Sequence, residues 1–348
     1  MKLVLGQDQQ ELRATVRSFL AGLSPREGHR PEVYARLNGE LGLSGLIIPE
    51  EYGGAGAGLT ELAVVLEETG AALLPGPFLA NALAAIALTQ VPDKELLTAV
   101  AEGRLTATVA PLPGGSDLVT ASRDGEALVE GRLAQVVNAA EADVLLAPVT
   151  RHDGVALVAI DLAGEGVTRT PLTTLDLTRS QAEVVLEGAR GRVLGSPPDG
   201  IALERAWNLF SVALAAEQLG VMRASLEAIV GYAKIRVAFG RYIGSYQGVK
   251  HKLADMHCKL EQAESIVRYA AWAADESPGE LPEAAALAQA YVGRACFEVA
   301  RDHLLLHGGI GFTWEHDAHL YYKRAKADEV LLGPPRTHRE RLADLLEL

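Results

Sequence analysis

Hydrophobic periodicity changes twice along this chain of 348 residues and divides it into three parts. In the first part, apolar residues such as Leu12, Val16 and Phe19 recur at helical spacing. In the second, short β-branched runs are separated by Gly, Asp or Pro, and helical patterns return from Ile201 onward. The order predicts an α+β (mostly α) fold made of an N-terminal helical domain, a middle antiparallel β-domain and a C-terminal helical bundle domain, at residues 1–104, 105–195 and 196–348.

Local patterns place the elements inside these parts. Pro31 opens one expected helix, and two more are expected at residues 59–74 and 79–88. Pro75, Pro77 and Asn81 interrupt the apolar stretch 73–88, which favours a buried core helix over a membrane span. The expected strands are residues 105–110, 127–133, 144–149, 155–160 and 182–186.

Composition excludes several classes of function. A formal net charge of −13 argues against nucleic acid or an anionic membrane as a partner, because phosphate binding needs a basic face. Cys258 and Cys296 are the only cysteines and are far apart, so we expect no disulfide framework and a reducing cytoplasm. Residues 1–8 lack a long apolar run after Lys2, and a signal peptide is not expected.

The segment 232–247 predicts an anion clamp. Arg236 ends one amphipathic pattern, Phe239 and Gly240 follow it, and Gln247 begins the next pattern. An Arg guanidinium can hold a pyrophosphate by bidentate hydrogen bonds, and Gly permits a tight turn. The N–H groups at the start of the following helix would face the same anion.

Three further segments extend this pattern. Residues 250–256 read K-H-K-L-A-D-M, residues 307–313 read H-G-G-I-G-F-T, and residues 42–56 contain P-E-E-Y-G-G-A-G. Together with the clamp, these segments resemble the FAD-dependent acyl-CoA dehydrogenases. Proteins of this family read P-E-x-Y-G-G-x-G near the N-terminus, then R-x-x-F-G-x-x-I-x-x-x-Q-x-x-x-x-x-L-A-D-M, and then Q-x-x-G-G-x-G. The resemblance covers nearly the whole chain and implies the acyl-CoA dehydrogenase fold, in which the C-terminal domain is a four-helix bundle, and FAD as cofactor.

The family's chemistry implies a carboxylate base, which removes the α-proton of an acyl-CoA while a hydride leaves the β-carbon for the flavin. The family places this base in one of two positions. Counting along this chain puts Leu332 at one and Phe210 at the other, with Ser211 where the family has an Arg. Since neither Leu nor Phe can accept a proton, the resemblance predicts no catalytic residue in this chain.

Glu204 offers a rival interpretation, because Leu203-Glu204-Arg205 mimics the family's helix-borne L-E-R. It lies six residues too early, which is a rotation of roughly 240° on a helix and turns Glu204 away from the site. Glu217 and Glu329 are further carboxylates nearby, and we expect structural roles for both.

The flavin-binding hydroxyls are also replaced. Where the family reads T-E-P-x-x-G-S-D, residues 110–117 read A-P-L-P-G-G-S-D, and where it reads I-T-N-A-x-x-A-D, residues 136–143 read V-V-N-A-A-E-A-D. Ala110 and Val137 stand at the hydroxyl positions. Each lost hydrogen bond costs about 1–3 kcal/mol in flavin binding.

In this family each FAD lies across a dimer interface, and the chain keeps the half that holds the pyrophosphate and adenosine. The cofactor-binding residues implied are Arg236, Phe239, Gly240, Gln247, Gly308, Gly309 and Gly311. Leu305 departs from the pattern, since the family has a Gln there. The resemblance therefore implies a heteromer, with a homologous catalytic subunit that binds most of the acyl-CoA, and an electron-transfer acceptor. The chain resembles the smaller, degenerate subunit of the actinobacterial α2β2 acyl-CoA dehydrogenases of steroid side-chain β-oxidation.

Two alternatives stay open, a self-sufficient homotetramer that uses Glu204 and a non-enzymatic scaffold on the same fold.

Other motifs give weaker signals. The glycine run 53–58 does not match G-x-G-x-x-G, and helix rather than strand is expected before it. Two histidine pairs, His303 with His307 and His316 with His319, lack the partners of a metal site and are expected on the helix surface or as caps. Trp314, Tyr321 and Tyr322 are expected to be packing aromatics.

Overall fold

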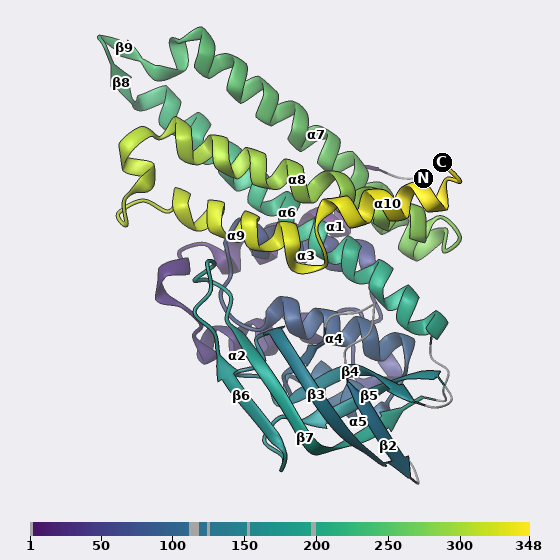
Figure 1. Ribbon diagram of the computed structural model, residues 1–348. Coiled ribbons are helices and arrows are strands. Elements are labelled where there is room, and N and C mark those ends of the chain that lie inside the picture. Colours follow the sequence, from purple (N-terminus) through teal and green to yellow (C-terminus); the bar gives the residue numbers. More distant parts are fainter. Residues whose placement is uncertain (1–2, 111–117, 124–125, 152–153, 196–199) are drawn as a thin grey trace.

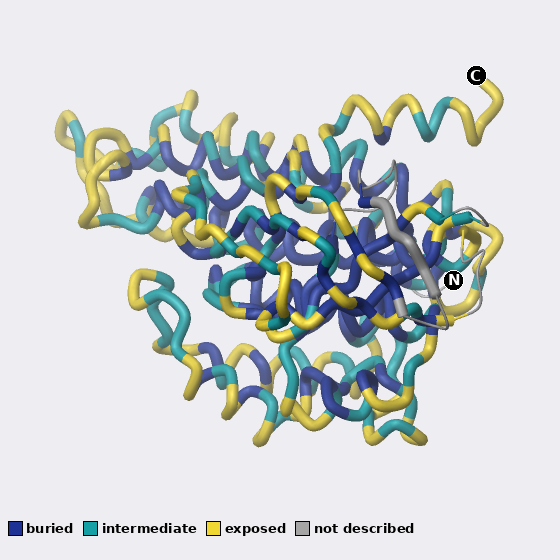
Figure 2. Tube along the Cα trace, turned by 60° about the horizontal axis from the view of Figure 1, so that its bottom comes forward, coloured by how far each residue is buried: buried dark blue, intermediate teal, exposed yellow. Residues whose placement is uncertain are grey.

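The computed structural model describes residues 3–110, 118–123, 126–151, 154–195 and 200–348, and it confirms the predicted order of helices, sheet and helices. In Figure 1 the C-terminal helices form the upper layer and the sheet forms the lower one. Figure 2 shows buried residues running through both layers, with exposed residues at the chain turns.

The N-terminal helices pack against both layers. They are α1 (Gln7–Leu20), α2 (Pro31–Leu41), α3 (Leu59–Ala71), α4 (Phe78–Gln90) and α5 (Lys94–Ala101). As predicted, the apolar stretch forms a core helix, because every residue of α4 from Phe78 to Leu88 is buried. Helix α5 was not predicted, because its eight residues are too few for a clear helical period.

Seven strands of the described chain form one curled sheet. They are β1 (Ala107–Val109), β2 (Val119–Arg123), β3 (Glu126–Val137), β4 (Val144–Arg151), β5 (Gly154–Asp161), β6 (Val167–Pro171) and β7 (Gln181–Leu194). Strand pairs β4–β2, β2–β3, β3–β7, β7–β5 and β5–β4 close a ring, and β6 extends β7 at its edge. The ring is a small barrel with its own apolar interior.

Alternation along β4 explains why this strand reads as an unbroken apolar run. Leu145 and Ala147 point into the barrel, whereas Leu146 between them packs against the helical core. Both faces are therefore buried. The expectation of an antiparallel sheet holds for most pairs, but β1 and β2 each pair parallel to β4. A crossover between parallel strands leaves no short turn signal in the sequence.

The C-terminal helices are α6 (Gly200–Ile235), α7 (Gln247–Glu276), α8 (Leu281–Leu306), α9 (Ala318–Leu331) and α10 (Pro335–Leu345). A short hairpin, β8 (Val237–Ala238) and β9 (Arg241–Tyr242), joins α6 to α7 and projects from one end of the bundle (Figure 1). In the described chain α6 alone is long and apolar enough to cross a membrane, but 89% of its apolar window is buried inside the protein. It is the central helix of the core.

The crossing of α3 over α6 depends on two glycines. A Cβ at Gly220 would lie 1.8 Å from the Glu67 carbonyl oxygen, and one at Gly70 would lie 2.1 Å from that of Glu217. The two backbones therefore touch directly. Close contact of this kind needs residues without side chains on both helices.

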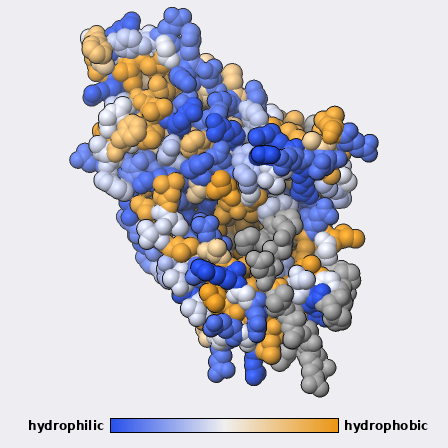
Figure 3. Space-filling model, in the orientation of Figure 1, coloured by the Kyte–Doolittle hydropathy of each residue, from blue (hydrophilic) through white to orange (hydrophobic). Residues whose placement is uncertain are grey.

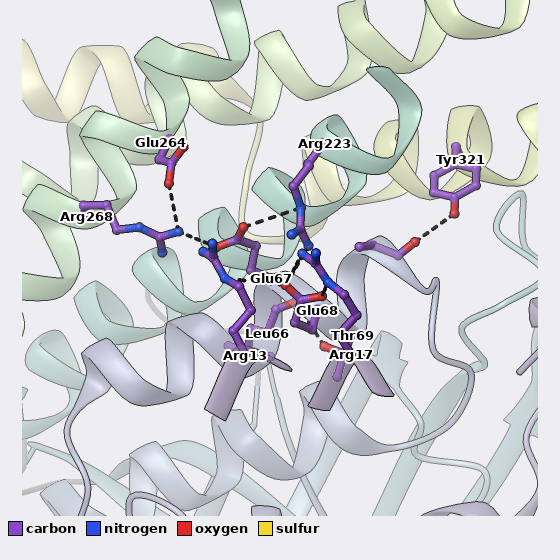
Figure 4. Close-up of polar contacts among 11 residues, drawn as sticks. Arg13, Arg17, Leu66, Glu67, Glu68, Thr69, Arg223, Glu264, Arg268 and Tyr321 are labelled. Carbon is purple, nitrogen blue, oxygen red and sulfur yellow. Dashed lines mark hydrogen bonds and ion pairs between the residues drawn. The ribbon is translucent and has the colours of Figure 1, made fainter. Parts of the chain in front are cut away.

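Buried ion pairs surround this crossing (Figure 4). Glu67 on α3 accepts hydrogen bonds from Arg13 of α1 at 2.9 Å and Arg268 of α7 at 2.5 Å. Its neighbour Glu68 binds Arg17 at 2.9 Å and Arg223 of α6 at 2.8 Å. Two buried carboxylates thus hold α1, α6 and α7 on α3, and removing one partner of such a pair typically costs 3–5 kcal/mol.

The glycine run 53–58 also has a packing role. A Cβ at Gly54 would lie 2.0 Å from the carbonyl oxygen of Ile48. Within the described residues 3–58 no strand precedes the run, as expected, so it does not begin a dinucleotide-binding unit.

Gly220→Ala should lower the free energy of unfolding by about 1–3 kcal/mol, because the new methyl group must push α3 away from α6. Gly231→Ala is the matched control on the same helix, since nothing lies within 4 Å of its added Cβ. That control should stabilise the protein by up to about 1 kcal/mol. Urea denaturation of both variants tests the pair, and equal stability would mean that the helices do not touch at Gly220.

Candidate functional site

A cavity of about 770 Å³ lies between the sheet and helices α4, α6 and α9. Its wall contains four of the positions at which the sequence departs from the acyl-CoA dehydrogenase pattern, the two flavin-hydroxyl positions and the two base positions, Ala110, Val137, Phe210 and Leu332. They come from the end of β1, the end of β3, the middle of α6 and the end of α9. The fold therefore gathers four distant departures into one space, although residues 111–117 of the first flavin motif lie outside the described residues.

Asp176 is the only carboxylate among the described residues that line this cavity. One of its oxygens accepts hydrogen bonds from the amide and the hydroxyl of Thr178 at 2.9 and 2.6 Å, and the other accepts one from Arg324 at 2.6 Å. Burial would raise the pKa of Asp176, but Arg324, Arg179 and the bonds from Thr178 outweigh it and lower that pKa. A carboxylate held in this way is a poor proton acceptor.

Cationic groups on the cavity wall also have partners. Lys326 binds Glu329 at 2.6 Å, and Arg132 pairs with Glu183. The hydroxyl of Thr108 donates to the carbonyl of Val137 at 2.6 Å, so it is engaged with the backbone. The part of the wall that replaces the flavin-binding hydroxyls is alkyl, which does not fit the polar edge of an isoalloxazine ring.

Beneath the cavity lies a buried charge cluster, defined here as Asp176, Arg179, Glu217, Arg324 and Asp328. Arg179 pairs with both Glu217 and Asp328, and Arg324 also reaches Glu217 at 3.1 Å. Three carboxyl groups share two guanidinium groups, and one oxygen of Asp328 has no partner in the described structure. Burial raises the pKa of Asp328 to about 7.

The three other carboxylates named from the sequence lie outside the cavity lining. The side chain of Glu204 is 63% exposed and faces α10, where its Oε1 lies 3.5 Å from Arg341. Because α6 is continuous from Gly200 to Ile235, no interruption turns Glu204 toward the cavity. Glu217 belongs to the buried charge cluster, and Glu329 pairs with Lys326 and Arg294.

A second hollow, which we call the tip groove, lies at the hairpin end of the bundle and measures about 680 Å³. It brings together Arg236, Phe239, Gly308 and Gly309, four of the seven residues assigned to cofactor binding, and Leu305 lines it as well. Figure 3 shows hydrophobic side chains gathered at this end of the molecule. Sequence reasoning missed Tyr232, His307 and Ile310, which also line the groove.

Phe239 and Gly240 form the two-residue turn of the β8–β9 hairpin. Both have positive φ, 51° and 77°, as a type I′ turn requires. This conformation is unfavourable for an aromatic residue, and the Phe239 ring is 98% exposed. Tyr246 stabilises the turn, because its hydroxyl donates to the Ala238 carbonyl at 2.9 Å and its ring lies 3.8 Å from the Arg241 guanidinium.

The other three assigned residues lie around the groove without being part of its lining. Gly240 follows Phe239 in the turn, and Gln247 is the exposed first residue of α7. Gly311 is buried, and a Cβ there would lie 2.6 Å from the carbonyl oxygen of Leu304. Its requirement for glycine is therefore explained by packing.

The electrostatics of the tip groove suit an anion. Arg236 is exposed and forms no ion pair with a described carboxylate, and no carboxylate is among the described lining residues. The N-terminus of α7 lies beside it and adds partial positive charge. The charge of the groove is therefore suited to a pyrophosphate group such as that of FAD, for which Arg236 would be the main ligand.

The histidines meet the sequence expectation in part. His303 is buried rather than on the surface, whereas His307, although also buried, is the C-cap residue of α8, and the Nδ1 of His316 accepts a hydrogen bond from the Ala318 amide at the start of α9. The rings of His316 and His307 lie 4.3 Å apart between centroids. Within the described residues no group of three or more His, Cys, Asp or Glu side chains is arranged to hold a metal ion. Trp314 is 68% exposed, and its ring packs edge-to-face on His319 at 4.9 Å between centroids. Tyr321 packs on His303 and donates to the Ala71 carbonyl, as expected of a packing aromatic.

Two family models match this chain. The model described as "Acyl-CoA dehydrogenase, N-terminal domain" matches residues 6–104, and "Acyl-CoA dehydrogenase, C-terminal domain" matches residues 201–346. The acyl-CoA dehydrogenase IpdE2 of Mycolicibacterium smegmatis is 36% identical over 332 residues, which is 95% of this chain and 93% of that protein.

Two solved heteromers have the same fold. The ChsE4–ChsE5 complex of Mycobacterium tuberculosis contains a chain with 27% identity and a TM-score of 0.91, covering 100% of this chain and 99% of that one. A variant of the Tcur3481–Tcur3483 steroid ACAD gives 28% identity and a TM-score of 0.89, covering 99% of each chain.

Asp328→Asn should make stability less dependent on pH. In an unfolded chain the pKa of an Asp is about 4, so between pH 4 and 7 the folded protein binds more protons and loses stability as the pH rises. Asn cannot ionise, so the free energy of unfolding of the variant should rise relative to that of the wild type by up to about 1.4 kcal/mol per pH unit in this window.

Asp176→Asn is the control for this substitution, because Asp176 has a lowered pKa and bonds on both oxygens. It should destabilise the protein at pH 7 by about 3–5 kcal/mol. Denaturation curves at several pH values measure the pH-dependent difference for Asp328→Asn and the loss of stability at pH 7 for Asp176→Asn. A constant difference between Asp328→Asn and the wild type from pH 4 to 7 would mean that Asp328 is ionised in the folded state.

Proposed function

Since this chain belongs to the acyl-CoA dehydrogenase family of oxidoreductases, we propose that it is the subunit of a heteromeric acyl-CoA dehydrogenase that completes a flavin site without carrying the catalytic base. One observation carries the proposal. Phe210 and Leu332, at the two positions where the family has its base, line the same cavity, whose one described carboxylate is fully bonded.

The distance between the two hollows supports a shared cofactor. On continuous α6, Phe210 of the cavity and Tyr232 of the tip groove are 22 residues apart, a rise of about 33 Å. This separation favours a flavin that uses only one of the two hollows of a given chain. The tip groove would serve a flavin whose isoalloxazine ring belongs to a partner subunit.

In such a complex the residues of this chain would bind and orient. Arg236 would hold the pyrophosphate by bidentate hydrogen bonds, and Phe239, Gly308 and Gly309 would shape the wall around the adenosine. FAD, when bound, supplies the acceptor for the hydride from the β-carbon of the acyl-CoA. The base and the acyl site would come from a homologous subunit.

The partner and the substrate are proposed by analogy with the similar heteromers. Chains of the ChsE4–ChsE5 complex and of a steroid ACAD share the fold over nearly their whole length, which supports a homologous partner, and the assembly that we propose is α2β2. The substrate class that we propose is a steroid side-chain CoA thioester, with an electron-transfer protein as acceptor and the cytoplasm as location.

Flavin stoichiometry tests the proposal. This chain purified alone should contain little FAD, because Ala110 and Val137 replace two hydrogen-bonding groups in its own cavity at about 1–3 kcal/mol each. Co-purified with its partner from the native host, it should give about one FAD per heterodimer by absorbance. Full flavin occupancy and dehydrogenase activity of the chain alone would overturn the proposal, and absence of flavin with every partner would favour a scaffold.

Arg236→Ala should remove FAD from the heteromer while assembly is retained, since the pyrophosphate loses its bidentate partner. Arg236→Lys should restore only part of the binding, because an ammonium group cannot make the paired contacts. Lys234→Ala, an exposed cation two residues away, is the matched control and should keep its flavin. Size-exclusion chromatography with flavin absorbance measures both properties, and an unchanged flavin content in Arg236→Ala would exclude the clamp.

A further inference from the structure

His307 lines the tip groove, yet neither the sequence motifs nor the proposed function gives it a role. Its Nδ1 lies 2.9 Å from the carbonyl oxygen of His303 on the preceding turn of α8. A carbonyl oxygen can only accept a hydrogen bond, so Nδ1 carries a proton. The opposite edge of the ring, with Nε2, is the one left for a ligand.

This tautomer has a chemical consequence. A neutral imidazole has one N–H, and His307 uses it on its own helix. Its Nε2 then has only a lone pair, which repels a phosphate oxygen. To donate a hydrogen bond to an anion, His307 must take up a second proton and become a cation.

The surroundings keep His307 neutral while the groove is free of an anion. Its ring is 4.5 Å from Tyr232 of α6, 4.8 Å from His303 of α8 and 4.3 Å from His316 of the segment before α9, measured between centroids. The charged group that shares the groove is Arg236, which repels a second cation. Burial lowers the pKa of His307.

The groups packed around the three histidine rings, His303, His307 and His316, are equally unable to stabilise a cation. His303 is 1% exposed and both its ring nitrogens lack partners in the described structure. Tyr321 of α9 packs against it and uses its hydroxyl on the Ala71 carbonyl. Asp302, next to His303 in sequence, pairs with Lys252 and Arg301, and Asp317, next to His316, pairs with Arg26. A bound anion would be the counter-charge that the cluster lacks.

We propose that His307 is a ligand of the FAD pyrophosphate that takes up one proton from solvent when the cofactor binds. The inference rests on the proposed function of the tip groove. Nε2 takes up the proton, keeps it and donates a hydrogen bond to a phosphate oxygen, while Nδ1 keeps its hydrogen bond to the His303 carbonyl. His307 thereby supplies a donor beside Leu305, which has none.

Cofactor affinity then depends on pH. If binding takes up a full proton, the dissociation constant rises up to tenfold for each pH unit above the pKa of free His307. A neutral or purely structural histidine would leave the affinity constant over the same range.

The experiment is calorimetric titration of the full chain with ADP-ribose, which carries the adenosine and pyrophosphate of FAD and does not titrate near neutral pH. Measurements in two buffers of different ionisation enthalpy, from pH 6 to 8, give the number of protons taken up per bound ligand. The wild type should take up a substantial fraction of one proton and bind more weakly as the pH rises.

Two variants identify the group. His307→Asn keeps a donor for the His303 carbonyl but cannot titrate, so it should bind with a pH-independent constant and no proton uptake. If the Asn variant does not fold, the same measurement is made on His307→Gln. His257→Asn is the control, because His257 is exposed on α7 outside the groove lining, and it should behave as the wild type.

The outcomes separate the two ideas. ADP-ribose binding by the wild type without proton uptake, or uptake that persists in the His307 variants, overturns the role of His307 and leaves the groove assignment standing. No binding to the wild type at any pH overturns the groove assignment itself, and the role of His307 with it.

Discussion

The direct backbone contact between α3 and α6 is the constraint on which the rest of the structure depends. Gly70 and Gly220 let the helices touch, and within two turns of that contact α6 carries Glu217 and Arg223. Arg223 joins the ion pairs with Glu67 and Glu68, while Glu217 joins the buried charge cluster. Because buried charges are costly without partners, the crossing and both ionic clusters must form together.

This arrangement fixes both hollows through one helix. The cavity lies next to Phe210 on α6, and the tip groove begins where α6 ends. The buried charge cluster ties Arg179 and Asp176, from the segment between β6 and β7, to α6 and α9, so it sets the distance between sheet and bundle. The volume of the cavity follows from that distance.

The sequence predicted the order of helices and strands because hydrophobic periods survive in long elements. It missed α5 and β6, which are short, and β6 alternates polar residues at the sheet edge. Counting from motifs placed Ala110 and Val137 individually, but only the tertiary fold brings them beside Phe210. The burial of His303 could not be predicted either, since its neighbours His316 and Tyr321 come from the segment before α9 and from α9 itself.

The residues that would decide catalysis are separate from those that hold the fold. Phe210 and Leu332 contact the cavity without entering either ionic cluster, so changing them alters the chemistry of the wall and leaves the ion pairs intact. Glu217, seven residues from Phe210 on the same helix, cannot be exchanged so freely, because two buried guanidinium groups need it. A chain of this fold can therefore lose a catalytic base and still keep the geometry with which it would complete a partner's cofactor site.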